Sequence, residues 1–256
     1  MIATQNLTYE VNGKVLIEDI STVFNVNEIN LIIGANGAGK STLINLLCNQ
    51  INPTKGSVIY EGLKTQLPSE LSKVRAVLSQ HIDMAFPLTV HEIVLMGRYP
   101  HFSHQPTEKD HQIVKEAMDL FQINAFSNRN YQTLSGGEKQ RVHFARVMAQ
   151  IWPDGKEQTK YLLLDEPLTY LDVYYQFDFM NKIKAIMQLQ PMVVIGVLHD
   201  LNLASQYANQ VLLLENGKVF QSGVPEKVLT KETISKVFDL EPTFFTDSNG
   251  KRHLSF

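Results

Sequence analysis

A nine-residue stretch that begins at Gly34 constrains the fold of this chain more than any other feature. The stretch comprises Gly34, Ala35, Asn36, Gly37, Ala38, Gly39, Lys40, Ser41 and Thr42. It fits the phosphate-loop pattern G-x-x-x-x-G-K-[ST] and directly follows the apolar run 29–33. The apolar run before the loop and the apolar pattern after it predict a strand, a loop and a helix that begins near Lys40.

Each fixed residue of this loop has a physical role in binding a triphosphate. Glycines let backbone N–H groups approach phosphate oxygens, and the helix N-terminus presents its positive end to the same anion. Lys40 would bring a full charge to the β- and γ-phosphates, and the Ser41 hydroxyl would bind Mg²⁺. The alternative is a glycine-rich turn that only starts an ordinary helix. The strand before the loop and the apolar pattern after it favour a nucleoside triphosphate site.

The composition is that of a globular protein with a sizeable core. The chain has 256 residues, of which 44% are hydrophobic, and this length allows one large domain or two small ones. The net charge is −3 and the charges are interspersed, which disfavours binding to DNA or RNA. The single cysteine, Cys48, cannot form an internal disulfide, so we expect a packed thiol in a reducing compartment.

The sequence lacks the patterns of targeting and membrane-spanning segments. Residues 1–6 do not have the charged-then-apolar plan of a signal peptide. The apolar runs 162–164, 192–198 and 211–214 are far shorter than a bilayer span requires. We therefore expect that the chain does not cross a membrane by itself, although it can act beside one through a partner.

Strands and helices alternate over most of the chain, which predicts an α/β fold with a mostly parallel sheet and antiparallel N-terminal strands. We expect strands at 3–9, 15–17, 28–33, 56–60, 76–78, 161–164, 192–198, 210–215 and 243–246. We expect helices at 41–50, 68–75, 89–97, 107–121, from Ser135 onward, and at 174–189, 202–208 and 231–238. Residues 81–157 carry helical patterns and little strand signal, so they form a helical insertion between 1–80 and 158–256.

Two carboxylates end a buried strand in the second half of the chain. The run 162–164, Leu-Leu-Leu, is followed by Asp165 and Glu166. Beside a phosphate loop, Asp165 can bind Mg²⁺ directly or hold one of its ligands, and Glu166 can orient or deprotonate an attacking water. Many strands end in an acid for solubility alone. The phosphate loop upstream favours the functional interpretation.

A second glycine-rich helix start lies at residues 134–138, Leu-Ser-Gly-Gly-Glu. Ser135 can cap this helix, and an ordinary N-cap with glycines for a tight turn is the simplest interpretation. Two consecutive glycines weaken a helix, however, so Gly136 and Gly137 indicate that some group approaches the backbone closely there.

Four motifs occur in a fixed order along the chain. They are the phosphate loop, Leu-Ser-Gly-Gly-Glu-Lys-Gln-Arg at 134–141, Leu-Leu-Leu-Asp-Glu-Pro at 162–167 and Leu-His-Asp at 198–200. In this order they resemble the ATP-binding subunit of ABC transporters, and the match covers nearly the whole chain. The resemblance implies a P-loop NTPase fold of ABC type and a single domain over residues 1–256. Its nucleotide-binding α/β core would be 1–80 and 158–256, and its helical subdomain, 81–157, would carry the signature motif.

The resemblance also implies roles for residues that carry little signal alone. Gln80 matches a glutamine that senses Mg²⁺, water and the membrane partner, and His199 matches a histidine that contacts the γ-phosphate. The signature residues Ser135, Gly136 and Gly137 match a motif that closes over the γ-phosphate of the nucleotide held by a second subunit. Residues 171–172, Leu-Asp, match a loop that communicates across the dimer. A lone glutamine at a strand end is usually a surface residue, and a lone histidine after an apolar strand is as often structural.

The chain departs from the family pattern at two places. Members of the family stack an aromatic residue on adenine from the strand pair near the N-terminus, and that position falls on Val11 here. Tyr9 lies two residues earlier on the same strand face, so either Tyr9 takes over the adenine contact or the stacking is weak. The small residues that usually precede the dimer-loop Leu-Asp are replaced by 168–170, Leu-Thr-Tyr, which alters the local dimer contacts.

Three segments narrow the resemblance to one subfamily. Gln-His at 80–81, Ala-Phe-Pro-Leu-Thr-Val at 85–90 and Val-Leu-Met-Gly-Arg-Tyr-Pro-His at 94–101 resemble the iron-chelate, cobalamin and haem importers. An extra segment at 150–157 most resembles haem importer ATPases, although the cargo would never touch this subunit. His101, His104 and His111 invite a metal or haem site. No carboxylate or cysteine completes a ligand set, so we interpret them as solvated loop residues.

The resemblance thus implies an ATPase that uses ATP and Mg²⁺ to energise an importer, with haem as the expected cargo. The catalytic residues would be Lys40, Gln80, Glu166 and His199, and the magnesium site would comprise Ser41, Gln80 and Asp165. Two copies would dimerise around two ATP molecules at the cytoplasmic face of the membrane. They would drive a permease dimer contacted near residues 80–100, with a periplasmic or surface substrate-binding protein in the complex and no nucleic acid.

Three other functions are open to a chain with these motifs. It could serve a ferric siderophore or cobalamin importer instead of a haem importer. A soluble ABC ATPase that acts on DNA or the ribosome is disfavoured, because this chain lacks room for a long coiled coil and has one ATPase unit rather than two. A P-loop kinase would not require the Leu-Ser-Gly-Gly-Glu signature.

Overall fold

The computed structural model describes residues 1–63, 67–79, 86–153, 155, 158–247 and 252–256 of the chain. The chain divides into two units. Unit 1 comprises Met1–Leu63, Leu163–Glu166 and Val193–Phe256, and unit 2 comprises Lys64–Leu162 and Pro167–Met192. Unit 2 thus contains the helical block 81–157 together with neighbouring segments. The division into a nucleotide-binding core and a signature subdomain stays a prediction.

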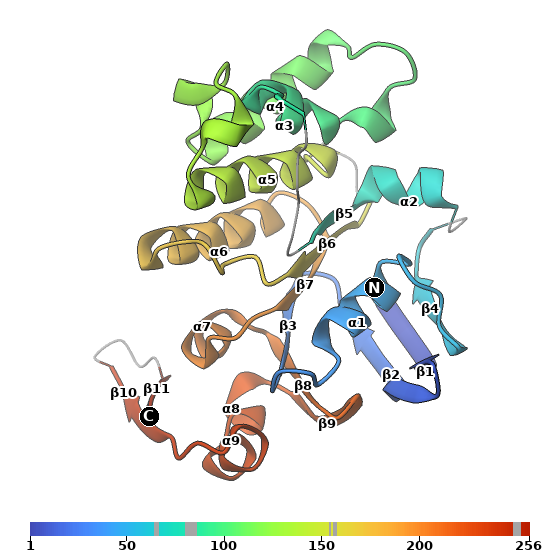
Figure 1. Ribbon diagram of the computed structural model, residues 1–256, viewed down its shortest axis with the longest axis vertical. Helices are drawn as coiled ribbons and strands as arrows, with labels where there is room; N and C mark the ends of the chain where they lie inside the picture. The colour runs from blue at the N-terminus through green and yellow to red at the C-terminus, as the bar shows by residue number, and fades with distance from the viewer. Residues whose placement is uncertain (64–66, 80–85, 154, 156–157, 248–251) are drawn as a thin grey trace. The chain divides into compact units, whose positions relative to one another are not determined.

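The main sheet has six strands (Figure 1). In spatial order they are β5 (Arg75–Leu78), β6 (Lys160–Asp165), β7 (Met192–Val197), β3 (Glu28–Gly34), β8 (Gln210–Glu215) and β9 (Lys218–Gly223). In unit 1, β3 pairs in parallel with β7 and β8, and β9 pairs antiparallel with β8. Every residue of β6 and β7 is buried, as in strands that are covered on both faces of a parallel sheet. The expected α/β fold with a mostly parallel sheet is confirmed.

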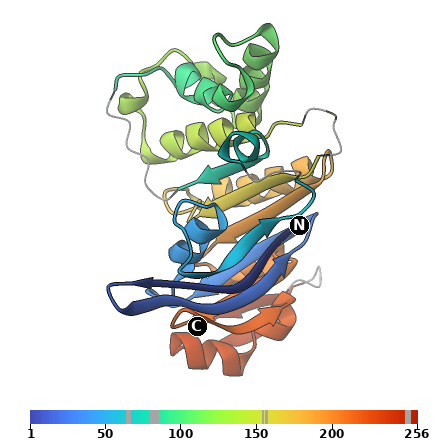
Figure 2. The same cartoon turned by 90° about the vertical axis from the view of Figure 1, so that its right-hand side faces the viewer.

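A second sheet in unit 1 is antiparallel, as the sequence predicted. It contains β1 (Ile2–Val11), β2 (Lys14–Phe24) and β4 (Lys55–Tyr60) in the order β2-β1-β4, and its first two strands form a long ribbon (Figure 2). β2 extends well beyond the predicted strand 15–17. The reason is a pair of irregular residues, Asn6 (φ 48°) and Asp19 (φ 52°), whose side chains share a 2.8 Å hydrogen bond. They interrupt the alternation of apolar and polar residues by which a strand is recognised.

The C-terminal part of unit 1 is held to the helix that follows His199. That helix is α7 (Leu201–Tyr207). The part held to it contains α8 (Pro225–Val228), α9 (Lys231–Phe238) and the hairpin of β10 (Thr243–Thr246) and β11 (Arg252–Ser255). The Asn202 side chain on α7 donates to the Leu254 carbonyl at 3.0 Å and accepts from the Leu254 amide at 2.7 Å. The predicted helix 231–238 and strand 243–246 are confirmed, whereas β9 and β11 were not expected.

Unit 2 is mainly helical and has an aromatic core. Its helices are α2 (Pro68–Val74), α3 (Val90–Met96), α4 (Glu108–Leu120), α5 (Gly136–Gln150) and α6 (Val173–Met187). Phe144 of α5 stacks on Phe179 of α6 with ring centroids 3.7 Å apart, and Phe121 packs against both rings. Helices α3, α4 and α5 each begin with a capping box, in which a Ser or Thr hydroxyl and an acidic side chain three residues later satisfy each other's backbone N–H groups.

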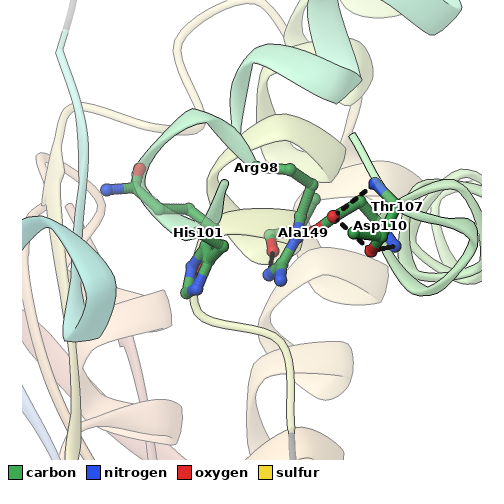
Figure 3. A network of polar contacts seen from close by, with 6 residues as sticks. Arg98, His101, Thr107, Asp110 and Ala149 are labelled. Atoms are coloured by element: carbon green, nitrogen blue, oxygen red, sulfur yellow. Dashed lines mark hydrogen bonds and ion pairs between the residues drawn. The ribbon is translucent and has the colours of Figure 1, made fainter. Parts of the chain in front are cut away.

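A buried ion pair fastens the end of α3 to α4 and α5 (Figure 3). Arg98 donates to Asp110 on α4 at 2.9 Å and to the Ala149 carbonyl on α5 at 2.7 Å. Burial raises the pKa of Asp110, but hydrogen bonds from Thr107 and Arg98 outweigh it and hold this pKa below its usual range. Gly97 lets the chain pass close to α5, because a Cβ there would lie 2.1 Å from the Arg146 carbonyl oxygen.

The three histidines singled out in the sequence do not share one environment. His104 is exposed, as expected. The expectation is wrong for His101, which is half-buried with its Nε2 2.7 Å from the Gln150 carbonyl oxygen, and burial lowers its pKa. His111 belongs to helix α4 rather than a loop, and its ring stacks on His91 with centroids 5.8 Å apart. Among the described residues, no group of three His, Cys, Asp or Glu side chains is arranged to hold a metal ion.

Within the described ranges, no helix combines the length and the apolar character that a bilayer crossing demands.

Candidate nucleotide-binding site

The phosphate loop connects β3 to α1 (Lys40–Leu47), as the sequence predicted (Figure 1). Gly39 precedes the helix with φ 101°, and a Cβ at this position would lie 2.8 Å from the Leu16 carbonyl oxygen, so the backbone requires glycine here. No side chain caps α1, and no acidic residue lies in its first turn. The first N–H groups of the helix, which have no partners inside a helix, are therefore available to an anion.

Lys40 crosses the loop that precedes it. Its side chain is largely buried, and Nζ donates to the carbonyl oxygens of Gly34 at 2.9 Å and Ala35 at 3.0 Å. Burial lowers the pKa of Lys40, whereas the nearby charges of Glu166 and Asp165 raise it. The ammonium is thus placed inside the loop itself, where the phosphate-loop pattern requires a cation.

Ser41 and Asp165 meet although 124 positions separate them. The Ser41 hydroxyl donates to Asp165 Oδ1 at 3.0 Å, which joins the start of α1 to the end of β6. Burial raises the pKa of Asp165, as does the Glu166 charge, while the Ser41 hydrogen bond and the Lys40 charge lower it. Hydroxyl and carboxylate oxygens are the ligands that Mg²⁺ prefers, so the donor chemistry here fits this ion.

Glu166 and His199 form a second pair next to Asp165. Glu166 Oε1 lies 2.6 Å from His199 Nε2, and the Glu166 side chain is only 15% exposed. Glu166 has a φ of 49°, a left-handed conformation that is uncommon outside glycine and that marks a sharp turn directly after β6. His199 follows β7, and Asp200 caps the next helix by accepting from the amides of Asn202 and Leu203. Two adjacent sheet strands therefore bring the acid and the histidine together.

The predicted signature lies at the start of α5 in unit 2. Ser135 is the N-cap, and Gly136 and Gly137 are the first two residues of the helix. Sequence reasoning recognised the cap but missed its partner, Glu138, whose carboxylate accepts from the Ser135 amide at 2.8 Å and from its hydroxyl at 2.9 Å. The S-x-x-E spacing was the available signal.

Three further residues were predicted to belong to the site, namely Gln80, Tyr9 and Val11. Gln80 lies outside the described residues. Tyr9 and Val11 are on β1, opposite Ile17 and Lys14 respectively, and Val11 is 38% exposed. Their assignment as adenine contacts, like the other residue roles, stays a prediction.

The chain is similar over nearly its whole length to known ATP-binding proteins. The ABC transporter family model matches residues 17–169. The hemin import ATP-binding protein HmuV of Escherichia coli O157:H7 is 38% identical over 249 residues, which cover 96% of this chain and 95% of that protein. HmuV of Gloeobacter violaceus is 42% identical over 243 residues, covering 94% and 88% respectively.

Solved structures of the same fold also resemble this chain. An inward-facing ABC transporter assigned to the metal-chelate type has a TM-score of 0.83 at 26% identity, covering 99% of this chain and 96% of that one. A dimeric ATP-binding cassette bound to ADP and phosphate has a TM-score of 0.74 at 24% identity, covering 88% and 99%. The phosphate loop, the acidic end of β6 and His199 lie close together in a fold of this kind. The chain belongs to the ABC transporter family as an ATP-binding member.

Proposed function

We propose that this chain is the ATP-hydrolysing subunit of a membrane importer for haem. The single observation that carries hydrolysis is the hydrogen bond between Ser41 and Asp165, because it joins the phosphate loop to the acidic end of β6. The haem cargo is supported by the two relatives named for hemin import. The subunit would act at the cytoplasmic face of the cell membrane.

The triphosphate would bind at the uncapped start of α1. The loop amides and Lys40 would face the β- and γ-phosphates, and Ser41 and Asp165 would hold Mg²⁺, with Gln80 as a further predicted group. When bound, the ion offsets charge on the phosphate oxygens. A cation beside Asp165 would also oppose the effect of burial on its pKa and keep the carboxylate ionised.

Glu166 would act on the attacking water. In hydrolysis the water oxygen bonds to the γ-phosphorus, the bond to the β–γ bridging oxygen breaks, and the water proton passes to a base. The Glu166 carboxylate can be that base, because His199 fixes its direction across a 2.6 Å contact. After the transfer His199 can steady the γ-phosphate, and Lys40 offsets the charge that builds up on it.

A second copy of the chain would complete each site. The signature residues Ser135, Gly136 and Gly137 would contact the nucleotide held by the partner, so that hydrolysis requires closure of a homodimer. The glycines support this assignment, because neither packing nor backbone conformation within the chain requires them: ideal Cβ atoms there would meet other atoms only at ordinary distances of 3.5 Å or more.

The permease would contact the segment near residues 80–100. In its described part, Phe86 is 73% exposed and Tyr99 is 58% exposed, so two large apolar side chains are accessible to a partner. Arg98 and His101, on either side of Tyr99, bond to the Ala149 and Gln150 carbonyls of α5, so the Tyr99 ring is presented from a fixed base. A periplasmic or surface binding protein would deliver the cargo to the permease.

A metal chelate is the second candidate cargo. It is supported by the structural likeness to the metal-chelate transporter at 26% identity. A siderophore complex or cobalamin would use the same ATPase chemistry, because the cargo passes through the permease and not through this subunit.

Two measurements test the proposal. The chain should co-purify with a polytopic membrane protein from detergent-solubilised membranes, and Tyr99→Ala should weaken this association while leaving nucleotide binding intact. In the reconstituted complex, haem delivered by its binding protein should stimulate ATP hydrolysis more than a ferric siderophore or cobalamin does. Association with ribosomes or DNA instead of a membrane protein would contradict transport, and stimulation by another chelate alone would contradict the cargo.

A further inference from the structure

The start of α5 is already occupied by a carboxylate of its own chain. Glu138 Oε2 accepts from the Ser135 amide at 2.8 Å and from the Ser135 hydroxyl at 2.9 Å, while the Glu138 amide donates back to that hydroxyl at 3.3 Å. The two Ser135 hydrogen bonds hold the pKa of Glu138 below its usual range, so the side chain is an anion at neutral pH. The hydroxyl that would donate to a phosphate therefore donates to Glu138.

The two glycines beside this carboxylate remain open to a ligand. The capping box involves the amides of Ser135 and Glu138, whereas Gly136 and Gly137 supply the first two N–H groups of the helix, which have no partner inside it. Two glycines at these positions weaken the helix, and Tyr170 is the nearest residue to both without crowding either. The amides of the two glycines are outside the capping box, whereas the Ser135 hydroxyl already donates to Glu138.

We propose that Glu138 competes with the nucleotide phosphate for Ser135 and thereby raises the ATP concentration at which two copies of the chain associate. This inference rests on the proposed function, in which the signature contacts the nucleotide of a second copy. An incoming phosphate would take over the Ser135 hydroxyl, and it would meet a like charge until the carboxylate rotates away.

Arg129 offers the displaced carboxylate a second partner. Its Nη1 lies 3.8 Å from Glu138 Oε1, half of its side chain is exposed, and its guanidinium lies 6.0 Å from the Phe126 ring centroid. Arg141 is the other cation that acts on Glu138, but its guanidinium lies 4.6 Å from the Tyr175 ring centroid and bonds to the Gln122 carbonyl. Arg129 is thus the side chain that can ease the exchange.

The test compares one substitution at two equivalent caps. Glu138→Gln preserves an acceptor oxygen for Ser135 but removes the charge, and Glu92→Gln does the same at the α3 capping box, where Thr89 donates to Glu92 with the same pattern. Both are made in a Glu166→Gln chain, so that ATP persists during the measurement. Light scattering then follows dimer formation as the ATP concentration rises, and labelled ATP measures binding to the monomer.

We expect Glu138→Gln to lower the ATP concentration for half-maximal dimerisation by roughly three- to tenfold, the effect of one like charge near a partly solvated phosphate. Glu92→Gln should leave it unchanged. Arg129→Ala should raise the ATP concentration for half-maximal dimerisation when Glu138 is present, and it should have little effect in the Glu138→Gln chain. A double-mutant cycle measures this coupling.

The outcomes separate this inference from the function on which it rests. Equal midpoints for Glu138→Gln and Glu92→Gln, or weaker dimerisation in Glu138→Gln, would overturn the competition and leave the ATPase assignment intact. If the Glu166→Gln parent binds labelled ATP but does not dimerise at any concentration, the dimer part of the proposed function fails and this inference fails with it.

Discussion

Two helix starts in this chain are glycine-rich and were both expected to meet phosphate, but they are built in opposite ways. At α1 the chain's own structure requires the glycine, because Gly39 has a left-handed backbone conformation and lies against the Leu16 carbonyl. No side chain caps that helix. At α5 the chain's own packing does not require the glycines, and Ser135 and Glu138 form a complete cap.

Under the proposed function, this difference separates a permanent anion site at α1 from a conditional one at α5. The α1 start presents amides and a lysine, and no acid of its own first turn competes with the ligand, so it can hold a triphosphate in one copy of the chain. The α5 start satisfies part of its own hydrogen bonding and carries a negative charge. In our proposal it would therefore bind phosphate well only after Ser135 exchanges Glu138 for the ligand. A site of the second kind responds to ligand and partner together, which suits a step that must wait for both.

Glu166→Gln gives the largest expected effect, and it changes the acid that lies beside the α1 site. Removing the base should lower ATP turnover by about 10²- to 10⁴-fold, while ATP binding persists because Lys40 and the loop amides are unchanged. Phosphate release and labelled-ATP titration measure the two quantities. Glu92→Gln, which removes the charge of a capping acid outside the nucleotide site, is the matched control and should retain turnover. Hydrolysis at the wild-type rate in Glu166→Gln would remove Glu166 from the mechanism.

Lys40→Ala tests the proposed phosphate site at the start of α1. The variant loses a charged donor from inside the loop, so nucleotide affinity should fall by about 10- to 100-fold, as for a charge-assisted hydrogen bond worth about 1.5–3 kcal/mol. Titration with labelled ATP and Mg²⁺ measures the change. Lys139→Ala removes a lysine from the first turns of α5 and should leave monomer affinity unaltered. Undiminished affinity and turnover in Lys40→Ala would contradict a phosphate site at α1.

A buried histidine on α5 predicts that unit 2 loses stability as the pH falls. His143 is 3% exposed with Nε2 2.7 Å from the Tyr131 hydroxyl, and burial lowers its pKa from 6.5 to about 3. Between these values the unfolded chain binds a proton that the folded chain does not, so stability falls as pH falls, by about 1.4 kcal/mol per unit. Urea unfolding at pH 7, 6 and 5, followed by Trp152 fluorescence, measures the slope.

The matched variant is His143→Gln, which can still bond to Tyr131 but does not titrate in this range. It should lose most of the pH dependence between pH 6 and pH 5. An unchanged slope in the variant would assign the acid sensitivity to other groups.

The sequence predicted best what depends on local pattern and on the topology of a parallel sheet. The helix after the phosphate loop, the helix predicted at 107–121 and the strand that ends at Asp165 all form as expected. Ser41 and Asp165 could be expected to lie near each other, because the parallel strands of one sheet end at the same edge of that sheet.

Long-range polar pairing could not be predicted in this way. The bond between Arg98 and Asp110 depends on how α3, α4 and α5 pack, and no spacing rule assigns an arginine to one of several acids. The half-buried position of His101 was missed for the same reason, since its partner is a backbone carbonyl on another helix. Strands β2, β9 and β11 have weak alternation, and their pairing depends on neighbours that the sequence does not reveal.

The smallest expected effect is that of Ser135→Ala. It separates two roles of the Ser135 hydroxyl, which caps α5 and is a proposed phosphate donor. Ser135→Ala removes a capping hydroxyl and should lower the free energy of unfolding by about 1 kcal/mol, as should Thr89→Ala at the equivalent position of α3. Urea unfolding should therefore not distinguish them. In the Glu166→Gln background only Ser135→Ala should raise the ATP concentration needed for dimerisation, because only Ser135 is a proposed phosphate donor. If both variants impair dimerisation equally, the hydroxyl at Ser135 does no more than stabilise its helix, and the conditional site would have to consist of the glycine amides alone.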